Sequence, residues 1–156
     1  MAAELKAGDK APAFSLKSDR GSTVSLKSLK GRQVVLYFYP KDDTPGCTKE
    51  ACGFRDAMPS LEKADAVVLG VSMDDAASHQ KFVKKYGLPF PLLCDEGGAM
   101  SKAYGVYKQK NMYGKTYWGI ERSTFIIDGT GRLKAVFRKV KVDGHVVEVQ
   151  AALMKG

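Results

Sequence analysis

Val34 to Tyr39 form an unbroken run of apolar and aromatic residues, and this run constrains the fold more than any other feature of the chain. Its length and its β-branched and aromatic content predict a strand that is buried on both faces. Pro40 is expected to end this strand because proline has no backbone N–H to donate to a sheet. Such a strand must be covered on both sides, which favours an α/β protein.

A helix is predicted to begin almost directly after this strand. Thr44 is a suitable N-cap, with its hydroxyl on the backbone N–H of Cys47, and Pro45 fits the first helical position. Helix N-termini and neighbouring cations lower cysteine pKa values from about 8.5 to about 3.5–7.5. We therefore expect the sulfur of Cys47, in the first turn, to be a largely ionised nucleophile at neutral pH. The alternative is a buried, inert cysteine.

A second cysteine, Cys52, lies on the other side of the predicted helix. Cys47 shares an apolar stripe with Ala51 and Phe54, whereas Cys52 lies among polar residues. Helix geometry places two Cα atoms with this spacing roughly 8.6 Å apart, beyond the roughly 7 Å limit for a disulfide. A Cys47–Cys52 bond would therefore require the helix to unwind. Two residues that lower helix stability, Gly46 and Gly53, flank the cysteines.

These residues carry a resemblance to a known family. Pro40-x-x-x-Thr44-x-x-Cys47, followed by Glu50, resembles the peroxidatic motif of the peroxiredoxins. Thr-Pro-Gly-Cys-Thr-x-x-Ala-Cys resembles their Q-type, the bacterioferritin-comigratory-protein subfamily, which is of the atypical 2-Cys kind. The match covers nearly the whole chain and includes segments 11–14, 37–40, 55–56, 92–96 and 114–128. A combination of motifs of this length is highly specific.

The resemblance implies roles for both cysteines and for Arg122. Cys47 would attack a peroxide O–O bond and become a sulfenic acid, and Cys52 would resolve it as an intramolecular disulfide. Arg122 would stabilise the thiolate and the transition state. Judged from the residues alone, Arg122 would more often be a surface residue of a strand.

Three further residues match the family's motif. The resemblance implies that Thr44 hydrogen-bonds the peroxide and the sulfur, that Pro40 shields the site from water, and that Glu50 steadies the arginine. Each also has a purely structural interpretation. Pro40 could only end a strand, Thr44 could only cap the helix, and Glu50 could be a solvated first-turn carboxylate that favours the helix dipole.

The resemblance implies a thiol-specific, antioxidant peroxidase in cell redox homeostasis. Its substrates would be hydrogen peroxide and small organic hydroperoxides, and thioredoxin or a similar dithiol would recycle it. No metal, haem or flavin cofactor is implied, and we expect a monomer, with a dimer as the alternative. The competing hypotheses are a general thiol–disulfide oxidoreductase, whose usual Cys-x-x-Cys is absent, and a basic binding module with incidental cysteines. A coupled NADPH–thioredoxin peroxidase assay separates them.

Composition restricts the partners and the compartment. The formal charge of +8 could indicate nucleic acid, but the basic residues are spread along the chain apart from Arg138-Lys-Val-Lys141. We therefore expect no nucleic-acid partner. No apolar run approaches the roughly 18 residues of a membrane span, so no membrane association is expected. Residues 1–6 contain no apolar leader segment, and three cysteines suit a reducing, cytoplasmic location.

The remaining pattern predicts an α/β fold with a mixed sheet, helices on both faces and an N-terminal β-hairpin within residues 13–27. Further strands are expected at 66–72, 91–95, 122–128 and 133–140, and an irregular stretch is expected after Tyr104 and through Trp118. Pro59 should kink or end the first helix, Asp74 or Asp75 should cap the second, and Asp143 should cap the last. This layout agrees with the thioredoxin-like fold of the resembled family, and residues 1–156 are predicted to form one such peroxiredoxin domain.

The other potentially reactive residues receive structural interpretations. Cys94 lies in a short apolar stretch, where cysteine behaves as a small hydrophobe, so it is not expected to resolve a sulfenic acid. His79 and His145 are expected on the surface, and no Cys–His dyad is predicted. A metal site is not predicted either, because Cys-x₄-Cys without nearby histidines misses the usual zinc spacings.

Overall fold

The computed structural model describes residues 4–155. The prediction that residues 1–6 contain no apolar leader therefore lies partly outside the described residues. Within this range the central sheet has five strands in the order β5-β4-β3-β8-β9. The strands β3, β4 and β5 are parallel, whereas β8 is antiparallel to β3 and β9 is antiparallel to β8. Their bounds are β3 (Gln33–Phe38), β4 (Ala66–Ser72), β5 (Leu92–Cys94), β8 (Ser123–Ile127) and β9 (Leu133–Phe137).

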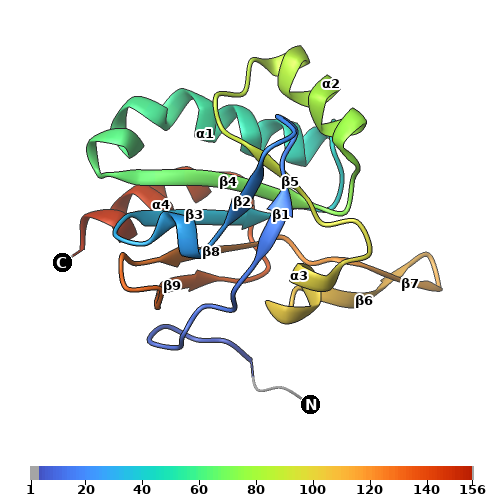
Figure 1. The fold of residues 1–156 in the computed structure, drawn as a ribbon. Coiled ribbons are helices and arrows are strands. Elements are labelled where there is room, and N and C mark those ends of the chain that lie inside the picture. The colour runs from blue at the N-terminus through green and yellow to red at the C-terminus, as the bar shows by residue number, and fades with distance from the viewer. Residues whose placement is uncertain (1–3, 156) are drawn as a thin grey trace.

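Two hydrophobic clusters cover the two faces of this sheet. On one face, side chains from α1 (Pro45–Lys63), α2 (Ala76–Tyr86) and α4 (His145–Met154) surround Val35 and Tyr37 of β3. On the other face, α3 (Ala99–Ala103) and the N-terminal hairpin cover Val34, Leu36 and Phe38. Figure 1 shows α1 lying along the sheet beside β4. The predicted mixed α/β layout is therefore confirmed.

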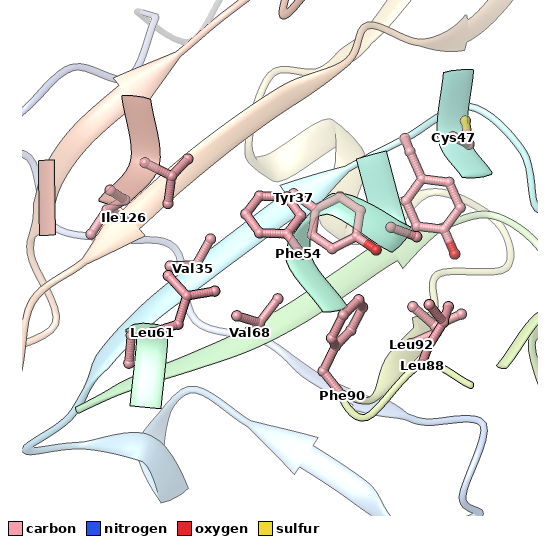
Figure 2. Packing of buried hydrophobic residues seen from close by; sticks show 14 of the residues in the cluster. Val35, Tyr37, Cys47, Phe54, Leu61, Val68, Leu88, Phe90, Leu92 and Ile126 are labelled. Carbon is pink, nitrogen blue, oxygen red and sulfur yellow. The ribbon is translucent and has the colours of Figure 1, made fainter. Parts of the chain in front are cut away.

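The strand β3 forms the centre of the core, as its sequence predicts. Each residue from Val34 to Tyr39 is at most 1% exposed. Alternate side chains enter opposite clusters, because successive residues of a strand point to opposite faces. Figure 2 shows Tyr37 beside Phe54 of α1, and these stacked rings have centroids 4.8 Å apart. Aromatic packing thus joins β3 to α1, the helix that carries Cys47.

Two hairpins flank the sheet, and only one of them was predicted. The N-terminal hairpin of β1 (Ser15–Lys17) and β2 (Thr23–Ser25) is confirmed, and a short 3₁₀ turn, η1 (Lys27–Leu29), leads from it towards β3. The prediction of an irregular stretch through Trp118 is wrong. That stretch forms β6 (Tyr107–Met112) and β7 (Lys115–Ile120), which extend away from the sheet in Figure 1.

The turn between β6 and β7 has the backbone conformation of a two-residue hairpin turn. Tyr113 and Gly114 both have positive φ, 53° and 78°, which fits the two-residue turns that match the twist of a hairpin. Most residues of β7 are exposed, as are the last residues of β6. The hydrophobic alternation that reveals a half-buried strand is therefore weak here.

The helix boundaries bear on three predictions. The helix α1 does not end at Pro59, which is exposed and lies inside it. Asp143 does not cap α4, whose N-cap is Gly144, and its carboxylate is instead paired with Lys49 of α1. Asp75 caps α2 as predicted, by accepting a hydrogen bond from the backbone N–H of Ser78 at 2.9 Å. None of the helices in the described range is long and apolar enough to cross a membrane.

Candidate active site

Cys47 lies in the first turn of α1, where the sequence places it. The backbone of Thr44 is the N-cap and Pro45 is the first helical residue. Cys47 is only 1% exposed and belongs to the cluster that includes Tyr37 and Phe54. Figure 2 shows it at the edge of that cluster, near the beginning of the helix. Its sulfur is therefore held by packing at the positive end of a helix dipole.

The hydroxyl of Thr44 does not make the predicted bond to the backbone N–H of Cys47. It donates instead to the carbonyl oxygen of Lys41 at 2.9 Å, and no side-chain cap is formed. The chain between these two residues turns through Asp43, whose φ of 56° is left-handed. The hydroxyl is thereby fixed at the start of the helix, and its oxygen can still accept a hydrogen bond. Pro40 precedes this turn and is exposed to solvent.

Arg122 approaches Cys47 from the segment between β7 and β8. Its Nη2 donates to the sulfur of Cys47 at 3.2 Å, and its Nη1 donates to Oε1 of Glu50 at 2.6 Å. The side chain of Arg122 is 16% exposed and that of Glu50 is fully buried. Burial tends to lower the pKa of Arg122, but the charges of Glu50 and Cys47 outweigh it and raise the pKa above its ordinary value. The structure thus brings Cys47, Glu50 and Arg122 together.

Glu50 binds the guanidinium of Arg122 in a buried position, where the loss of water disfavours the charge of its own carboxylate. Burial raises the pKa of this carboxyl to about 7, although the charge of Arg122 opposes the shift. Its Oε1 accepts from Arg122, whereas Oε2 has no hydrogen-bond partner among the described residues. The carboxylate therefore orients the arginine in an environment that penalises its own charge.

Gly46 has a role that the sequence reasoning missed. A Cβ atom at this position would lie 3.1 Å from Nη2 of Arg122. The absence of a side chain therefore lets the guanidinium reach the sulfur of the next residue. Sequence reasoning interpreted Gly46 only as a weak point of the helix, because Arg122 is far away in the sequence.

Cys52 lies on the opposite side of α1 from Cys47, as predicted. It is half-buried and lines an open cavity of about 430 Å³ between α1 and residues 142–147 at the start of α4. A Cβ atom on the neighbouring Gly53 would lie 3.1 Å from Cγ2 of Val146, so α1 and α4 are in close contact here. No cysteine of the described chain forms a disulfide in this structure. Bringing Cys52 to Cys47 requires α1 to change shape.

Cys94 ends β5 and is half-buried. Burial, followed by the charges of Glu96 and Asp19, raises the pKa of its thiol to about 11. The thiol is therefore protonated at neutral pH, which makes it a poor nucleophile.

Both histidines are buried, so the prediction that they lie on the surface is wrong. His145 contacts Oγ1 of Thr124 at 2.7 Å and the carboxylate of Glu148 at 3.2 Å. Burial lowers the pKa of His145, with a smaller opposing effect from Glu148. His79 contacts Asp42 and the carbonyl of Leu93. Partners for both ring nitrogens make burial possible. Asp42, Leu93 and Thr124 are distant from these histidines in the sequence, whereas Glu148 lies one helical turn after His145.

Three potential metal ligands lie close together near the segment between β3 and α1. One ligand atom each from Asp42, Asp74 and His79 lies within 4.8 Å of the others. The ring nitrogens of His79 and both oxygens of Asp42 already take part in hydrogen bonds. Oδ2 of Asp74 accepts from the backbone N–H of Asp42 and from Ser72, so hydrogen bonds join these three residues to one another and to their neighbours.

Known proteins are similar to this chain in sequence and in fold. The model of the AhpC/TSA family matches residues 7–136. The chain is 57% identical over 149 residues to a putative peroxiredoxin Bcp of Coxiella burnetii, covering 96% of this chain and 99% of that one. It is 52% identical to peroxiredoxin Bcp of Bacillus subtilis, covering 96% of this chain and 95% of the relative. A Xanthomonas campestris bacterioferritin comigratory protein, described for its alkyl peroxide reduction activity, is 44% identical, with a TM-score of 0.89 and coverage of 94% and 96%.

These similarities agree with the geometry. A thioredoxin-like fold with a cysteine and an arginine in contact at a helix start defines a thiol-based oxidoreductase, and the predicted fold class is confirmed. The chain belongs to the AhpC/TSA family and, within it, to the Bcp-type peroxiredoxins, which are thiol peroxidases.

Proposed function

We propose that this protein reduces hydrogen peroxide and small organic hydroperoxides with Cys47 as the peroxidatic cysteine. The observation that carries this proposal is the 3.2 Å hydrogen bond from Arg122 to the sulfur of Cys47. A guanidinium in this position stabilises a thiolate and can stabilise charge that develops on the peroxide oxygens. The alkyl peroxide reduction described for the Xanthomonas campestris relative supports this substrate class.

The first half-reaction oxidises Cys47. Its thiolate attacks one peroxide oxygen, an S–O bond forms, and the O–O bond breaks. The leaving oxygen takes the bonding electron pair and a proton, and departs as water or an alcohol. The cysteine is left as a sulfenic acid, two electrons more oxidised than the thiol. The balance requires no metal, haem or flavin.

The residues around Cys47 have distinct roles in this step. Thr44 offers its hydroxyl oxygen as an acceptor for the peroxide O–H, because its own proton is donated to Lys41. Arg122 provides donors to the sulfur and to the breaking O–O bond, and Glu50 orients the guanidinium. Pro40 limits access of water at the solvent boundary of the site.

Cys52 completes the second half-reaction as the resolving cysteine. Its sulfur attacks the sulfur of the sulfenic acid, the Cys47–Cys52 disulfide forms, and the hydroxyl leaves as water. Thioredoxin or a similar dithiol protein then reduces this disulfide and is itself oxidised to a disulfide. The cavity beside Cys52 gives this cysteine solvent access, whereas Cys47 is buried.

The proposed site and its reaction cycle favour a monomeric protein in a reducing compartment. All the proposed site residues come from one chain, so we propose a monomer in which residues 1–156 form one peroxiredoxin domain, with a dimer as the alternative. A disulfide that must be reduced in each cycle suits the cytoplasm. Light scattering after size-exclusion chromatography and cell fractionation test these two statements.

A coupled NADPH–thioredoxin assay tests the function. The wild-type protein should consume NADPH only when peroxide is present, and Cys47→Ser should not. Turnover retained in Cys47→Ser would refute the site. Peroxide-independent reduction of insulin disulfides at a comparable rate would favour the general thiol–disulfide oxidoreductase instead.

A further inference from the structure

The loop of residues 40–44, which joins β3 to α1, is anchored by a buried carboxylate. Asp42 is only 7% exposed. Its Oδ1 accepts from the hydroxyl of Tyr39 at 2.6 Å, and its Oδ2 accepts from the hydroxyl of Ser78 at 2.8 Å and contacts Nδ1 of His79 at 2.6 Å. Ser78 and His79 belong to α2, so this carboxylate joins the active-site loop to a different helix.

The contacts of His79 define its protonation state. Its Nε2 lies 2.9 Å from the carbonyl oxygen of Leu93, which can only accept, so Nε2 carries a proton. Its Nδ1 lies 2.6 Å from the Asp42 carboxylate, which also accepts hydrogen bonds from two hydroxyl groups. Both ring nitrogens therefore face hydrogen-bond acceptors, an arrangement that favours the doubly protonated imidazolium. Burial lowers the pKa of His79, but Asp42, Leu93 and Asp74 outweigh it, and the pKa is raised.

Further contacts hold the same loop. The backbone N–H of Asp42 donates to Oδ2 of Asp74 at 2.9 Å, and this carboxylate also accepts from Ser72 at 2.6 Å. The exposed carboxylate of Asp43 accepts from Lys85 at 2.9 Å and from Tyr86 at 2.7 Å. Asp43 has a left-handed φ, a conformation that is uncommon for residues other than glycine.

We propose that Asp42 and His79 form a buried carboxylate–imidazolium pair that positions the active-site loop, and with it the hydroxyl of Thr44, for reaction with peroxide. This inference rests on the proposed function. The pair touches neither Cys47 nor substrate, so its two members are positioning residues. It acts through the turn between Lys41 and Thr44, which starts one residue before Asp42 and ends two residues after it.

The buried Asp42–His79 pair differs from the exposed Asp43–Lys85 ion pair beside it. Exposed ion pairs contribute little because water competes for both charges. Removing one member of a buried pair leaves an uncompensated charge, and the surroundings must rearrange to solvate it. The rearrangement would displace the loop, and displacements of about 1 Å can slow a reaction about 100-fold.

Two reactions of Cys47 distinguish a displaced Thr44 hydroxyl from a general loss of Cys47 reactivity. Oxidation by hydrogen peroxide needs Thr44 in place, whereas alkylation by iodoacetamide depends on the Cys47 thiolate, which Arg122 stabilises, and makes no use of the Thr44 hydroxyl. In Asp42→Asn and in His79→Gln, the second-order rate constant for oxidation should fall about 10- to 100-fold. The rate constant for alkylation at pH 7 should be unchanged. Tyr39→Phe, which keeps the ring and removes one donor to Asp42, should show the same pattern more weakly if the other variants do not fold.

The matched control is Lys85→Met. It removes the exposed ion pair between Asp43 and Lys85, which lies on α2 as His79 does, and should leave both rate constants unchanged. The inference is overturned if the folded variants react with peroxide as fast as the wild type, if both reactions slow equally, or if Lys85→Met loses as much. If peroxide does not oxidise the wild-type protein at all, the proposed peroxidase function is refuted, and the role of the Asp42–His79 pair is refuted with it. These results can be told apart because sulfenic acid is measured directly, without a reductant.

Discussion

Arg122 donates a hydrogen bond to the sulfur of Cys47 at 3.2 Å although the two residues are 75 positions apart in the sequence. The register of the sheet explains this contact. The strand β8 pairs with β3 so that Ser123 lies opposite Phe38, near the end of β3 from which the chain continues into α1. Arg122 immediately precedes Ser123, so antiparallel pairing delivers it to the edge of the sheet where Cys47 lies.

Replacing Arg122 by methionine removes this donor while keeping most of the apolar stem. We expect oxidation of Cys47 by peroxide to slow by about 10²–10³-fold, which is typical for the loss of one donor to developing charge. Alkylation of Cys47 should also require a higher pH, because the thiolate loses a positive neighbour. Stopped-flow oxidation and iodoacetamide alkylation between pH 5 and 9 measure these effects. Arg32→Met, which removes an exposed arginine paired with Asp65, is the control. An unchanged pH dependence of alkylation would contradict the prediction.

Gly46→Ala tests how closely the arginine must approach. The new methyl group would lie 3.1 Å from Nη2 of Arg122, whose position is already fixed by Glu50. Alanine favours the helix over glycine by up to about 1 kcal/mol, so this change should not destabilise α1. Peroxide oxidation should nevertheless slow about tenfold or more, because the guanidinium is displaced from the sulfur. A variant that is both as stable and as fast as the wild type would show that Arg122 can adjust.

Glu50 should make stability depend on pH. Burial raises the pKa of its carboxyl to about 7 in the folded protein, against an ordinary value of 4.5. The folded state therefore holds this proton more tightly. The resulting stabilisation is complete below about pH 4.5 and is lost as the pH rises through about 7. Glu50→Gln has no such titration, so the wild type should lose up to about 3 kcal/mol of unfolding free energy relative to this variant between about pH 4.5 and 8.

Urea unfolding of the reduced proteins at several pH values measures this difference. Glu62→Gln, on an exposed part of the same helix, should give a curve parallel to that of the wild type. The prediction fails if Glu50→Gln and the wild type also change in parallel, because Glu50 would then titrate alike in the folded and unfolded chains.

Cys52 and Cys94 should differ sharply when each is replaced by serine. Cys52→Ser should consume one equivalent of peroxide, lose thioredoxin-supported cycling and become prone to overoxidation, since its sulfenic acid lacks a partner. Cys94→Ser should cycle normally, because the raised pKa of Cys94, about 11, keeps its thiol protonated. Turnover in the coupled assay and intact mass after peroxide treatment distinguish the two. Normal cycling by Cys52→Ser would indicate that Cys94 or an external thiol resolves the sulfenic acid.

Local sequence was sufficient for the part of the site that local structure builds. The strand Val34 to Tyr39, the helix start at Pro45 and the opposite faces of Cys47 and Cys52 follow from residue types and helical spacing. Arg122 was identified only through the family resemblance, because its approach depends on how β8 pairs with β3.

Where the sequence prediction was wrong, distant or local partners explain the difference. His79 is buried because Asp42, 37 positions away, lies against one ring nitrogen. The hydroxyl of Thr44 turns to Lys41 instead of the helix because of the left-handed turn at Asp43. The β6–β7 hairpin lacks the alternation of a half-buried strand, so periodicity could not reveal it.

The disulfide proposed for turnover should open the first part of α1. The two cysteines lie on opposite sides of the helix, too far apart for a bond in an intact helix. Unwinding gives up several backbone hydrogen bonds at about 0.5–1.5 kcal/mol net each. It also disturbs the stacking of Phe54 on Tyr37, the close contact of Gly53 with Val146, and the Lys49–Asp143 pair. The open form should therefore be a minor state until the disulfide holds it.

We accordingly expect oxidation to remove helical content and amide-exchange protection across residues 46–56. The strand β3 should stay protected, because it is hydrogen-bonded on both sides by β4 and β8. Peroxide-treated Cys52→Ser, which cannot form this bond, is the matched control and should keep its protection. Exchange measured by mass spectrometry on reduced and oxidised samples decides the question. If residues 46–56 are equally protected in both samples while the Cys47–Cys52 bond is confirmed by mass, the disulfide forms without opening α1, and the two sulfurs must meet by a different movement.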